Sequence, residues 1–419
     1  MNVVIQTVGT RGDVEPFVAL GLGLVAAGHE VSVATAPSFE GFVSDRGLAF
    51  APIRADYYEL LDTPEAQAAL KNPLKMRSMI NDTIKPLMRR MLEDQASTSE
   101  GADLVVFHPK AMGATHVGEL RRIPVVAGLP VPAMLPTADF PLPGFSVSPP
   151  AFLNKASYRL LDLSTAPFNK IITQWRTGEL GLPARARGVG NFKLGDGAWP
   201  PTLLAVSPSV VPKPGDWPAD SSVPGYWFLD PDPGWEPPSD LVEFLAAGPA
   251  PVAVGFGSMV VDDPQRIGSE ILAGIRASGR RVVMVTGRST FAPEPADDLS
   301  LVDAIPNHWL YPQMAAVIHH GGAGTTAAGL RGGTPSIVTP VMGDQTFWGK
   351  RVAAIGAGPE PLPAKKISAA GIEARVRQAT GAGSIPDRAA AVGEAIRAED
   401  GIGAAVGTIE SIRDRYREV

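Results

Sequence analysis

The feature that most constrains the fold is a repeated alternation of a short apolar strand, a loop and an amphipathic helix. It begins with an apolar run at 2–7, a glycine-containing loop at 9–13 and a helical pattern at 14–27 that Gly28 ends. A second apolar run follows at once at 31–35. Strand–loop–helix–strand units build parallel sheets covered by helices, and strands buried on both faces read as continuous apolar runs. We therefore predict an α/β protein.

The alternation occurs in two series. Further strands are expected at 104–107, 125–128 and 203–206, then at 252–256, 282–286, 301–304, 316–319 and 336–339. Helices are expected at 74–95, 111–121 and 151–177, then at 264–278, from 324 and at 346–355. Between the series, residues 207–239 hold nine prolines and three tryptophans and show no periodicity. Proline stiffens such a segment, which favours an ordered linker.

We accordingly predict two doubly wound, Rossmann-like domains, at 1–206 and 240–400, joined by a linker at 207–239. The last segment, 401–419, carries Ile409, Ile412 and Tyr416 at helical spacing and predicts an amphipathic helix that covers a sheet face. Ligands of such sheets bind at the carboxyl ends of the strands, so the two domains should face each other across a binding cleft. The proline-rich stretch 130–150 is expected as a loop on its rim.

Composition narrows the possible partners. The 419 residues carry a net charge of −6, which argues against a general nucleic-acid binder. The absence of cysteine excludes disulfides and thiolate metal sites, and the six histidines lack metal-ligand spacing, so no metal is expected. The uncharged stretch 244–261 contains glycines and prolines and predicts a turn and a strand rather than a transmembrane segment. With no recognisable signal peptide, we expect a cytoplasmic protein.

The strongest local motif is His-His-Gly-Gly-Ala-Gly-Thr-Thr at 319–326, which follows an apolar strand and opens a helix. Glycines allow close approach of the backbone, and N–H groups at a helix start attract an anion. His320 offers a ring donor and Thr325 a hydroxyl, so the motif suits a diphosphate. The alternative interpretation is a glycine-rich turn of close packing.

Asp344 and Gln345 follow the strand at 336–339 and begin another helix. A carboxylate beside a carboxamide can accept and donate hydrogen bonds, which is the chemistry that reads sugar hydroxyls. An aspartate at a helix start is also a common N-cap, and that alternative stays open.

Asp13 lies in the loop after the first strand, at the edge where ligands bind. A carboxylate there can take a proton from an attacking hydroxyl, although a helix cap is an equally simple interpretation. His108 ends another strand and is a candidate for weak contact with the acceptor.

These motifs together resemble family 1 glycosyltransferases, which have the GT-B fold. The resemblance is carried by the block from Ile305 through Gln345 and by the segments at 9–16, 224–228 and 255–259. It covers nearly the whole chain and is similar to the branch of sterol glucosyltransferase-like and bacterial natural-product enzymes. The resemblance implies two Rossmann-like domains with a nucleotide-sugar donor bound to the second.

The resemblance also implies which residues hold the donor diphosphate. A histidine two residues before the signature glycine contacts the phosphates in this family, and His320 stands two before Gly322. Gly324 and Thr325 follow on the same helix start. Ser258, in the Gly-Ser-Met loop, is implied to touch the same phosphates.

Asp344 and Gln345 match the pair that reads the sugar hydroxyls, and Asp13 matches the general base. One position departs from the plant pattern, because Ala304 lies near the place of a tryptophan that stacks on uracil. Base recognition is then expected through the backbone near Ile305, which leaves uridine and thymidine donors both open.

We expect an inverting, metal-independent transferase that moves a hexose from UDP-glucose to a hydroxyl of a lipophilic acceptor and forms a β-glycoside. A sterol, macrolide, polyketide or phenol would fit, held between the loop 130–150 and the segment 57–90, which includes Tyr57, Met76, Met79 and Met88. No cofactor is needed beyond the co-substrate. The alternative is a secondary-metabolite enzyme with a TDP-deoxysugar donor. A dinucleotide-dependent oxidoreductase fits less well, because the first loop lacks the glycine spacing that such enzymes need.

Overall fold

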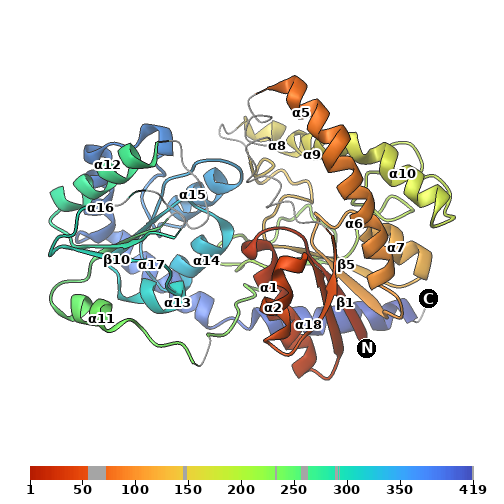
Figure 1. Cartoon of the computed structure of the whole chain (residues 1–419), viewed down its shortest axis with the longest axis horizontal. Coiled ribbons are helices and arrows are strands. Elements are labelled where there is room, and N and C mark those ends of the chain that lie inside the picture. The colour runs from red at the N-terminus through yellow and green to blue at the C-terminus, as the bar shows by residue number, and fades with distance from the viewer. Residues whose placement is uncertain are drawn as a thin grey trace.

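The computed structural model describes residues 1–54, 72–144, 149–231, 234–255, 263–287, 291 and 293–417. These residues form two parallel-sheet lobes that lie side by side (Figure 1). Both ends of the chain lie in the first lobe, because the C-terminal helix returns to it.

The first lobe is built on a seven-stranded sheet with the order β3-β2-β1-β4-β5-β6-β7. Its strands are β1 (Asn2–Gln6), β2 (Glu30–Thr35), β3 (Ala49–Pro52), β4 (Leu104–Phe107), β5 (Val125–Leu129), β6 (Thr202–Leu204) and β7 (Ser221–Ser222). All pair in parallel, and Val3 of β1 lies opposite both Val31 of β2 and Leu104 of β4. The order reverses between β1 and β4, where ligands bind in doubly wound sheets. β7 comes from the segment expected as linker.

Helices cover both faces of this sheet. They are α1 (Arg11–Ala26), α2 (Glu40–Ser44), α5 (Pro73–Met79), α6 (Lys85–Thr98), α7 (Ala114–Arg121), α8 (Asn154–Ser157), α9 (Arg159–Thr165) and α10 (Asn169–Gly178). The helix expected at 74–95 contains a π turn at Ile80–Ile84, directly before the Lys85-Pro86 start of α6. Proline has no N–H to close an α-helical bond, which favours a local change of this kind. The helix expected at 151–177 is likewise split into short helices, with a 3₁₀ turn at Ala166–Phe168 that contains Pro167.

The second lobe has a five-stranded parallel sheet with the order β10-β9-β8-β11-β12. The strands are β8 (Val252–Gly255), β9 (Val282–Val285), β10 (Leu299–Val302), β11 (Ala316–His319) and β12 (Ser336–Val338). The helices are α11 (Ser239–Ala246), α12 (Pro264–Ala277), α13 (Asn307–Leu310), α14 (Ala323–Arg331), α15 (Gln345–Ala354), α16 (Ala369–Thr380) and α17 (Ser384–Arg397). Here the order reverses between β8 and β11, so the loop before α14 lies at the switch point.

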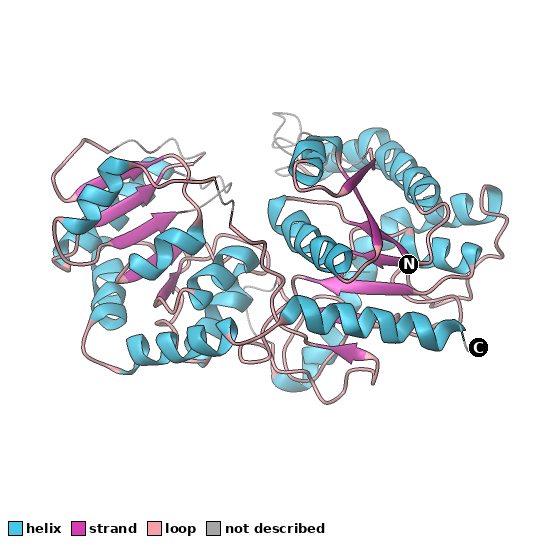
Figure 2. Cartoon of the chain, turned by 90° about the horizontal axis from the view of Figure 1, so that it is seen from below, coloured by secondary structure: helices cyan, strands magenta, loops and turns pink. Residues whose placement is uncertain are grey.

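The C-terminal helix α18 (Gly401–Arg417) lies along the first lobe and packs against α1 (Figure 2). Ile409 and Ile412 are buried in the core beneath that sheet, as the helical spacing predicts. The same prediction was wrong for Tyr416, which is 49% exposed near the end of the helix. His29 Nε2 lies 2.9 Å from a Glu410 carboxylate oxygen, so a polar contact also ties α18 to the first lobe.

The two lobes also meet through α15 and the segment that follows β6. Arg351 of α15 donates from Nε to the carbonyl of Val210 at 2.9 Å. Ser207 donates to Glu399 at 2.6 Å, just before α18 begins. One apolar cluster contains Val210 together with Trp348 of α15, so this junction is packed as a core.

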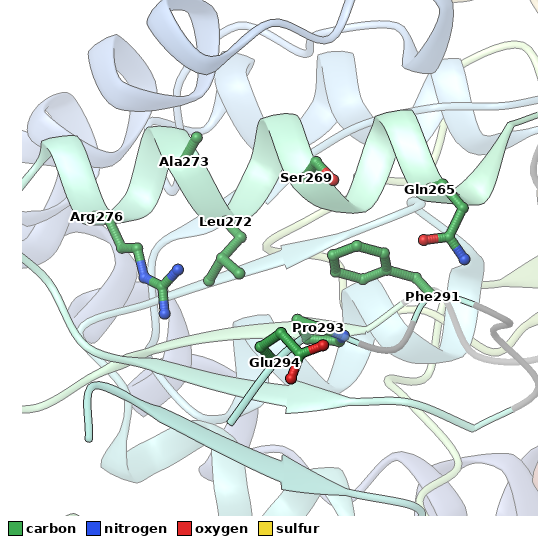
Figure 3. Close-up of a pocket in the computed structure, with 8 residues that line it drawn as sticks. All are labelled: Gln265, Ser269, Leu272, Ala273, Arg276, Phe291, Pro293 and Glu294. Carbon is green, nitrogen blue, oxygen red and sulfur yellow. The ribbon is translucent and has the colours of Figure 1, made fainter. Parts of the chain in front are cut away.

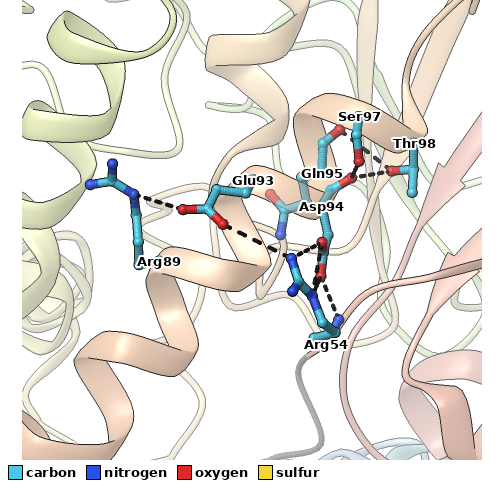
Figure 4. A network of polar contacts seen from close by, with 7 residues as sticks. All are labelled: Arg54, Arg89, Glu93, Asp94, Gln95, Ser97 and Thr98. Atoms are coloured by element: carbon cyan, nitrogen blue, oxygen red, sulfur yellow. Dashed lines mark hydrogen bonds and ion pairs between the residues drawn. The ribbon is translucent and has the colours of Figure 1, made fainter.

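Helix α6 fixes the loop that follows β4. Asp94 accepts from the Arg54 backbone N–H at 2.8 Å and from its guanidinium at 2.7 Å, which joins α6 to the end of β3 (Figure 4). The side-chain oxygen of the next residue, Gln95, accepts the Gly113 N–H at 2.7 Å. The backbone carbonyl of Gln95 accepts a hydrogen bond from the Gln6 side chain of β1. These contacts fix the position of the loop that follows β4 relative to β1.

Candidate active site

The loops after β1 and β4 bring three ionisable side chains together. Asp13 lies in the first turn of α1, and His108 and Lys110 directly follow β4. His108 Nε2 is 3.3 Å from Asp13 Oδ1, and Lys110 Nζ is 2.8 Å from Asp13 Oδ2. The strands β1 and β4 are neighbours in the sheet, so residues 97 positions apart become contacts.

Hydrogen bonds within the cluster define the state of each group. The Lys110 backbone N–H donates to His108 Nδ1 at 3.1 Å, so the hydrogen of the neutral ring is on Nε2 and points to Asp13. Burial lowers the pKa of His108, which keeps the ring neutral. Burial also raises the pKa of the Asp13 carboxyl, but His108 and Lys110 outweigh it and hold that pKa well below its usual range. Asp13 is therefore ionised at neutral pH.

Asp13 combines the two interpretations that the sequence left open. Its Oδ2 accepts the Thr10 backbone N–H at 2.8 Å and the Thr10 hydroxyl at 3.0 Å, a capping arrangement for α1. The same carboxylate remains 18% exposed at the strand edge. The cap thus orients the group that could act as a base.

The glycine-rich motif connects β11 to α14 as the sequence predicts. Gly321 has φ +91°, and a side chain there would collide with Val338. A side chain on Gly322 would come within 2.5 Å of His320 Nε2, so this glycine makes room for the imidazole ring. Around Gly324 there is open space, because an added Cβ would meet no atom within 4 Å.

Two parts of this motif, the start of α14 and the His320 ring, lack side-chain partners among the described residues. No side chain among the described residues caps α14, whose first turn includes Gly324 and the half-buried Thr325. His320 Nδ1 is buried and has no hydrogen-bond partner among them. Burial lowers the pKa of His320 to about 4, so the ring is neutral and can donate one N–H. The arrangement can receive an anion.

Its neighbour His319 has a different environment. It is completely buried, and its Nδ1 accepts the Gly321 N–H at 3.1 Å. Burial, with a smaller effect from His320, lowers the pKa of His319 to about 3. This ring therefore braces the loop.

Asp344 and Gln345 begin α15 but point to different partners. Asp344 Oδ2 accepts the Trp348 indole N–H at 2.7 Å and makes no capping bond to the helix. Gln345 Oε1 accepts the N–H groups of Val341 and Met342 at 2.7 and 3.0 Å. The oxygen of Gln345 thus shapes the preceding loop, whereas the half-buried Asp344 carboxylate retains further acceptor capacity.

Charges from the first lobe act on Asp344 of the second. Burial raises the pKa of Asp344; the Asp13 charge also raises it, and the Lys110 charge lowers it. Phe140 of the rim loop stacks edge-on against Phe347 of α15, with ring centroids 5.3 Å apart. The carboxyl ends of β1 and β4 therefore face that of β12.

The other candidate residues are distributed more widely. Ile305 is buried in the core of the second lobe, so only its backbone could serve the base contact expected there. Met88 is core, whereas Met76 and Met79 are half-buried. Ser258 and Tyr57 lie outside the described residues. Sequence reasoning missed Lys110, although its place two residues after His108 was a usable signal.

We also searched the described residues for metal sites, membrane-spanning helices and pockets. No group of three or more His, Asp or Glu side chains there could hold a metal ion. Within the same residues, no helix has the length and apolarity to cross a bilayer. A surface pocket lies between α12 and the segment around Phe291, and none of the candidate residues lines it (Figure 3).

Family models match both lobes. Residues 3–135 match the glycosyltransferase family 28 N-terminal domain, and residues 268–402 match the erythromycin biosynthesis protein CIII-like C-terminal domain. The spinosyn forosaminyltransferase SpnP has a similar fold, with a TM-score of 0.71, 17% identity and 99% of each chain covered. This likeness identifies the fold as GT-B.

Two sterol 3-beta-glucosyltransferases of Arabidopsis thaliana are 35% and 33% identical to this chain, each over 97% of it. The chain spans 64% and 67% of their lengths. The similarity includes both lobes and the segments that carry the candidate site. The chain belongs to the GT-B glycosyltransferases, in the family that includes the sterol 3-beta-glucosyltransferases.

Proposed function

We propose that this protein transfers glucose from UDP-glucose to a hydroxyl of a lipophilic acceptor, with inversion at the anomeric carbon. The proposal rests on the groups that lie at the carboxyl ends of the strands in the two lobes. One edge carries the ionised Asp13 carboxylate. The other carries the buried His320 ring, whose Nδ1 has no partner among the described residues, and the start of α14, which no described side chain caps. A transferase of this kind needs both a proton acceptor and a stabilised leaving group.

The donor is assigned to the second lobe. The first-turn N–H groups of α14 and the His320 ring would bind the diphosphate, and Asp344 would accept a hydrogen bond from a hexose hydroxyl. The open space around Gly324 supports close approach of a phosphate. Gln345 acts on the sugar chiefly through the loop that its oxygen holds.

The reaction is assigned to a direct displacement. Asp13 removes the proton of the acceptor hydroxyl, whose oxygen attacks the anomeric carbon as the bond to the diphosphate breaks. The negative charge that develops on the diphosphate is stabilised by the helix start and His320, without a metal ion. An α-linked donor would give a β-glycoside.

The acceptor class follows from the relatives and from the surroundings of Asp13. The names of the relatives specify a sterol as acceptor. Phe140 and Phe347 provide an aromatic contact between the rim loop and α15, which supports an apolar acceptor beside the carboxylates. We assign the protein to the cytoplasm.

The direct test supplies the full chain with UDP-glucose and a sterol in detergent, in excess EDTA. We expect a product heavier by one hexose, with a β-anomeric proton coupling in its NMR spectrum. TDP-glucose and TDP-deoxysugars tested in parallel identify the donor base and sugar. An α-linked product would contradict inversion, and activity that returns only with Mg²⁺ or Mn²⁺ would contradict metal independence. Transfer only from TDP-deoxysugars would assign the protein to secondary metabolism.

A further inference from the structure

The Asp13 carboxylate is held unequally at its two oxygen atoms. Oδ2 accepts three hydrogen bonds, from the Thr10 N–H at 2.8 Å, the Thr10 hydroxyl at 3.0 Å and Lys110 Nζ at 2.8 Å. A carboxylate oxygen offers about two lone-pair directions, so Oδ2 has no remaining acceptor capacity. Oδ1 has one partner among the described residues, His108 Nε2 at 3.3 Å.

This asymmetry distinguishes Lys110 from an ordinary surface cation. Its side chain is 48% exposed, but its ammonium group reaches the strand edge where Asp13 and Asp344 face each other. The loop that carries Lys110 is fixed at both ends. The Lys110 backbone N–H donates to His108 Nδ1, and the Gly113 N–H donates to the Gln95 side chain of α6. The ammonium group is therefore presented to Asp13 by a braced backbone.

We propose that Lys110 is a positioning residue for the transfer, which occupies Oδ2 of Asp13 and leaves Oδ1 as the atom that receives the proton. The inference rests on the proposed function. The acceptor O–H bond breaks and its proton passes to Oδ1, while the acceptor oxygen bonds to the anomeric carbon. The bond from that carbon to the diphosphate breaks, and its electron pair leaves with the diphosphate. His108, already protonated on Nε2, orients Oδ1.

Lys110 also affects the ionisation of Asp13, because its charge lies next to the carboxylate. The groups that face the carboxylate are His108 and Lys110 from the β4 loop and Asp344 from the opposite lobe. Of these, Lys110 carries the positive charge, while His108 is neutral and Asp344 is acidic. His108 and Lys110 together lower the pKa of Asp13, with His108 the larger influence, and so keep it ionised next to a second carboxylate.

The test compares Lys110→Met with Lys110→Arg, which keeps the charge. We expect kcat to fall about 10–100-fold in Lys110→Met because the carboxylate loses its orientation. Lys110→Arg should recover most of that loss. The acid limb of kcat/KM should move to higher pH in Lys110→Met, by about 1–3 units, since an opposite charge is removed from Asp13. UDP affinity, measured by calorimetry, should stay within about twofold in both variants.

Lys155→Met is the matched control, because Lys155 forms a similar exposed pair with Asp216 at 3.2 Å. Its kcat and acid limb should be those of the wild type. The proposal is overturned if Lys110→Met keeps the wild-type kcat and acid limb, or if it loses UDP affinity as strongly as kcat. Absence of transfer by the wild-type protein would instead refute the proposed function.

Discussion

The candidate groups at the two strand edges of the site, the Asp13 carboxylate and the His320 ring with the start of α14, differ in how far they are satisfied without a ligand. At the first edge, Asp13 accepts bonds from Thr10, His108 and Lys110. At the second, the described residues provide no partner for His320 Nδ1 and no side-chain cap for α14. A buried group without a hydrogen bond costs about 1–3 kcal/mol, so native proteins retain few of them.

This difference indicates that the two strand edges are organised for different tasks. The first edge is organised before any substrate binds, as suits a group that must meet a proton in one geometry. Under the proposed function, the second edge gains hydrogen bonds from the donor diphosphate. Proton transfer then belongs to the first lobe, whereas the second lobe binds the donor and stabilises the charge on the leaving diphosphate. Each prediction below can contradict that division.

The largest effect is expected for Asp13→Asn. The carboxamide preserves the shape of the side chain but cannot take the proton, so kcat should fall by about 10²–10⁴. Steady-state assays with UDP-glucose and saturating acceptor measure the loss. Near-normal turnover would remove Asp13 from the role of base and leave it as a helix cap.

His320→Ala should produce the next largest effect. Loss of a hydrogen bond to a charged phosphate weakens binding by about 1.5–3 kcal/mol. UDP and UDP-glucose both contain the diphosphate, so calorimetry should find the same loss for both ligands. A loss confined to UDP-glucose would place His320 at the sugar and not at the phosphates.

A smaller and more selective effect is expected for Asp344→Asn. The amide oxygen can still accept the Trp348 indole bond, so the helix start should remain intact. The sugar hydroxyl loses a charged acceptor, which lowers kcat/KM for UDP-glucose by about 1 kcal/mol and changes the ratio of glucose to galactose transfer. UDP binding should be unaffected. Equal damage to UDP binding would mean that Asp344 is structural.

Buried neutral histidines at both edges should make the stability of the protein sensitive to acid, because burial lowers the pKa of His108 and of His319. The pKa of buried His319 is lowered to about 3, so the unfolded chain binds its proton first as the pH falls below about 6.5. Stability should therefore decrease between pH 7 and pH 5, with a contribution from His319 of about 2 kcal/mol. The Asp13 contribution persists there, because the pKa of Asp13 is depressed and its carboxylate stays ionised.

Urea unfolding at the two pH values measures this difference, with His319→Asn as the test variant. Asparagine can accept the Gly321 N–H as the ring does but does not titrate. The decrease should be smaller in His319→Asn than in the wild type. An identical decrease in both proteins would show that His319 does not contribute to it.

Local sequence patterns predict where much of the candidate site lies between the strands and helices of the fold. The glycine motif at 319–326 and Asp344 at the start of α15 lie where strand and helix periodicity predict them. Periodicity does not report which loops touch, so the contact of Lys110 with Asp13 depends on the pairing of β1 with β4. Strand β7, with two residues, is too short to show a pattern. The Gln345 contacts with its own loop depend on backbone conformation and have no signal in spacing.

The division of labour is tested most directly by single-turnover transfer at increasing UDP-glucose, with Asp13→Asn and His320→Ala measured side by side. In the Asp13→Asn variant, the rate at saturating donor should remain about 10²–10⁴ below the wild type. In His320→Ala, much of the defect should disappear as the donor concentration rises, and the remaining defect should reflect the lost stabilisation of the leaving diphosphate. A defect in Asp13→Asn that disappears at saturating donor would contradict the assignment of chemistry to the first lobe.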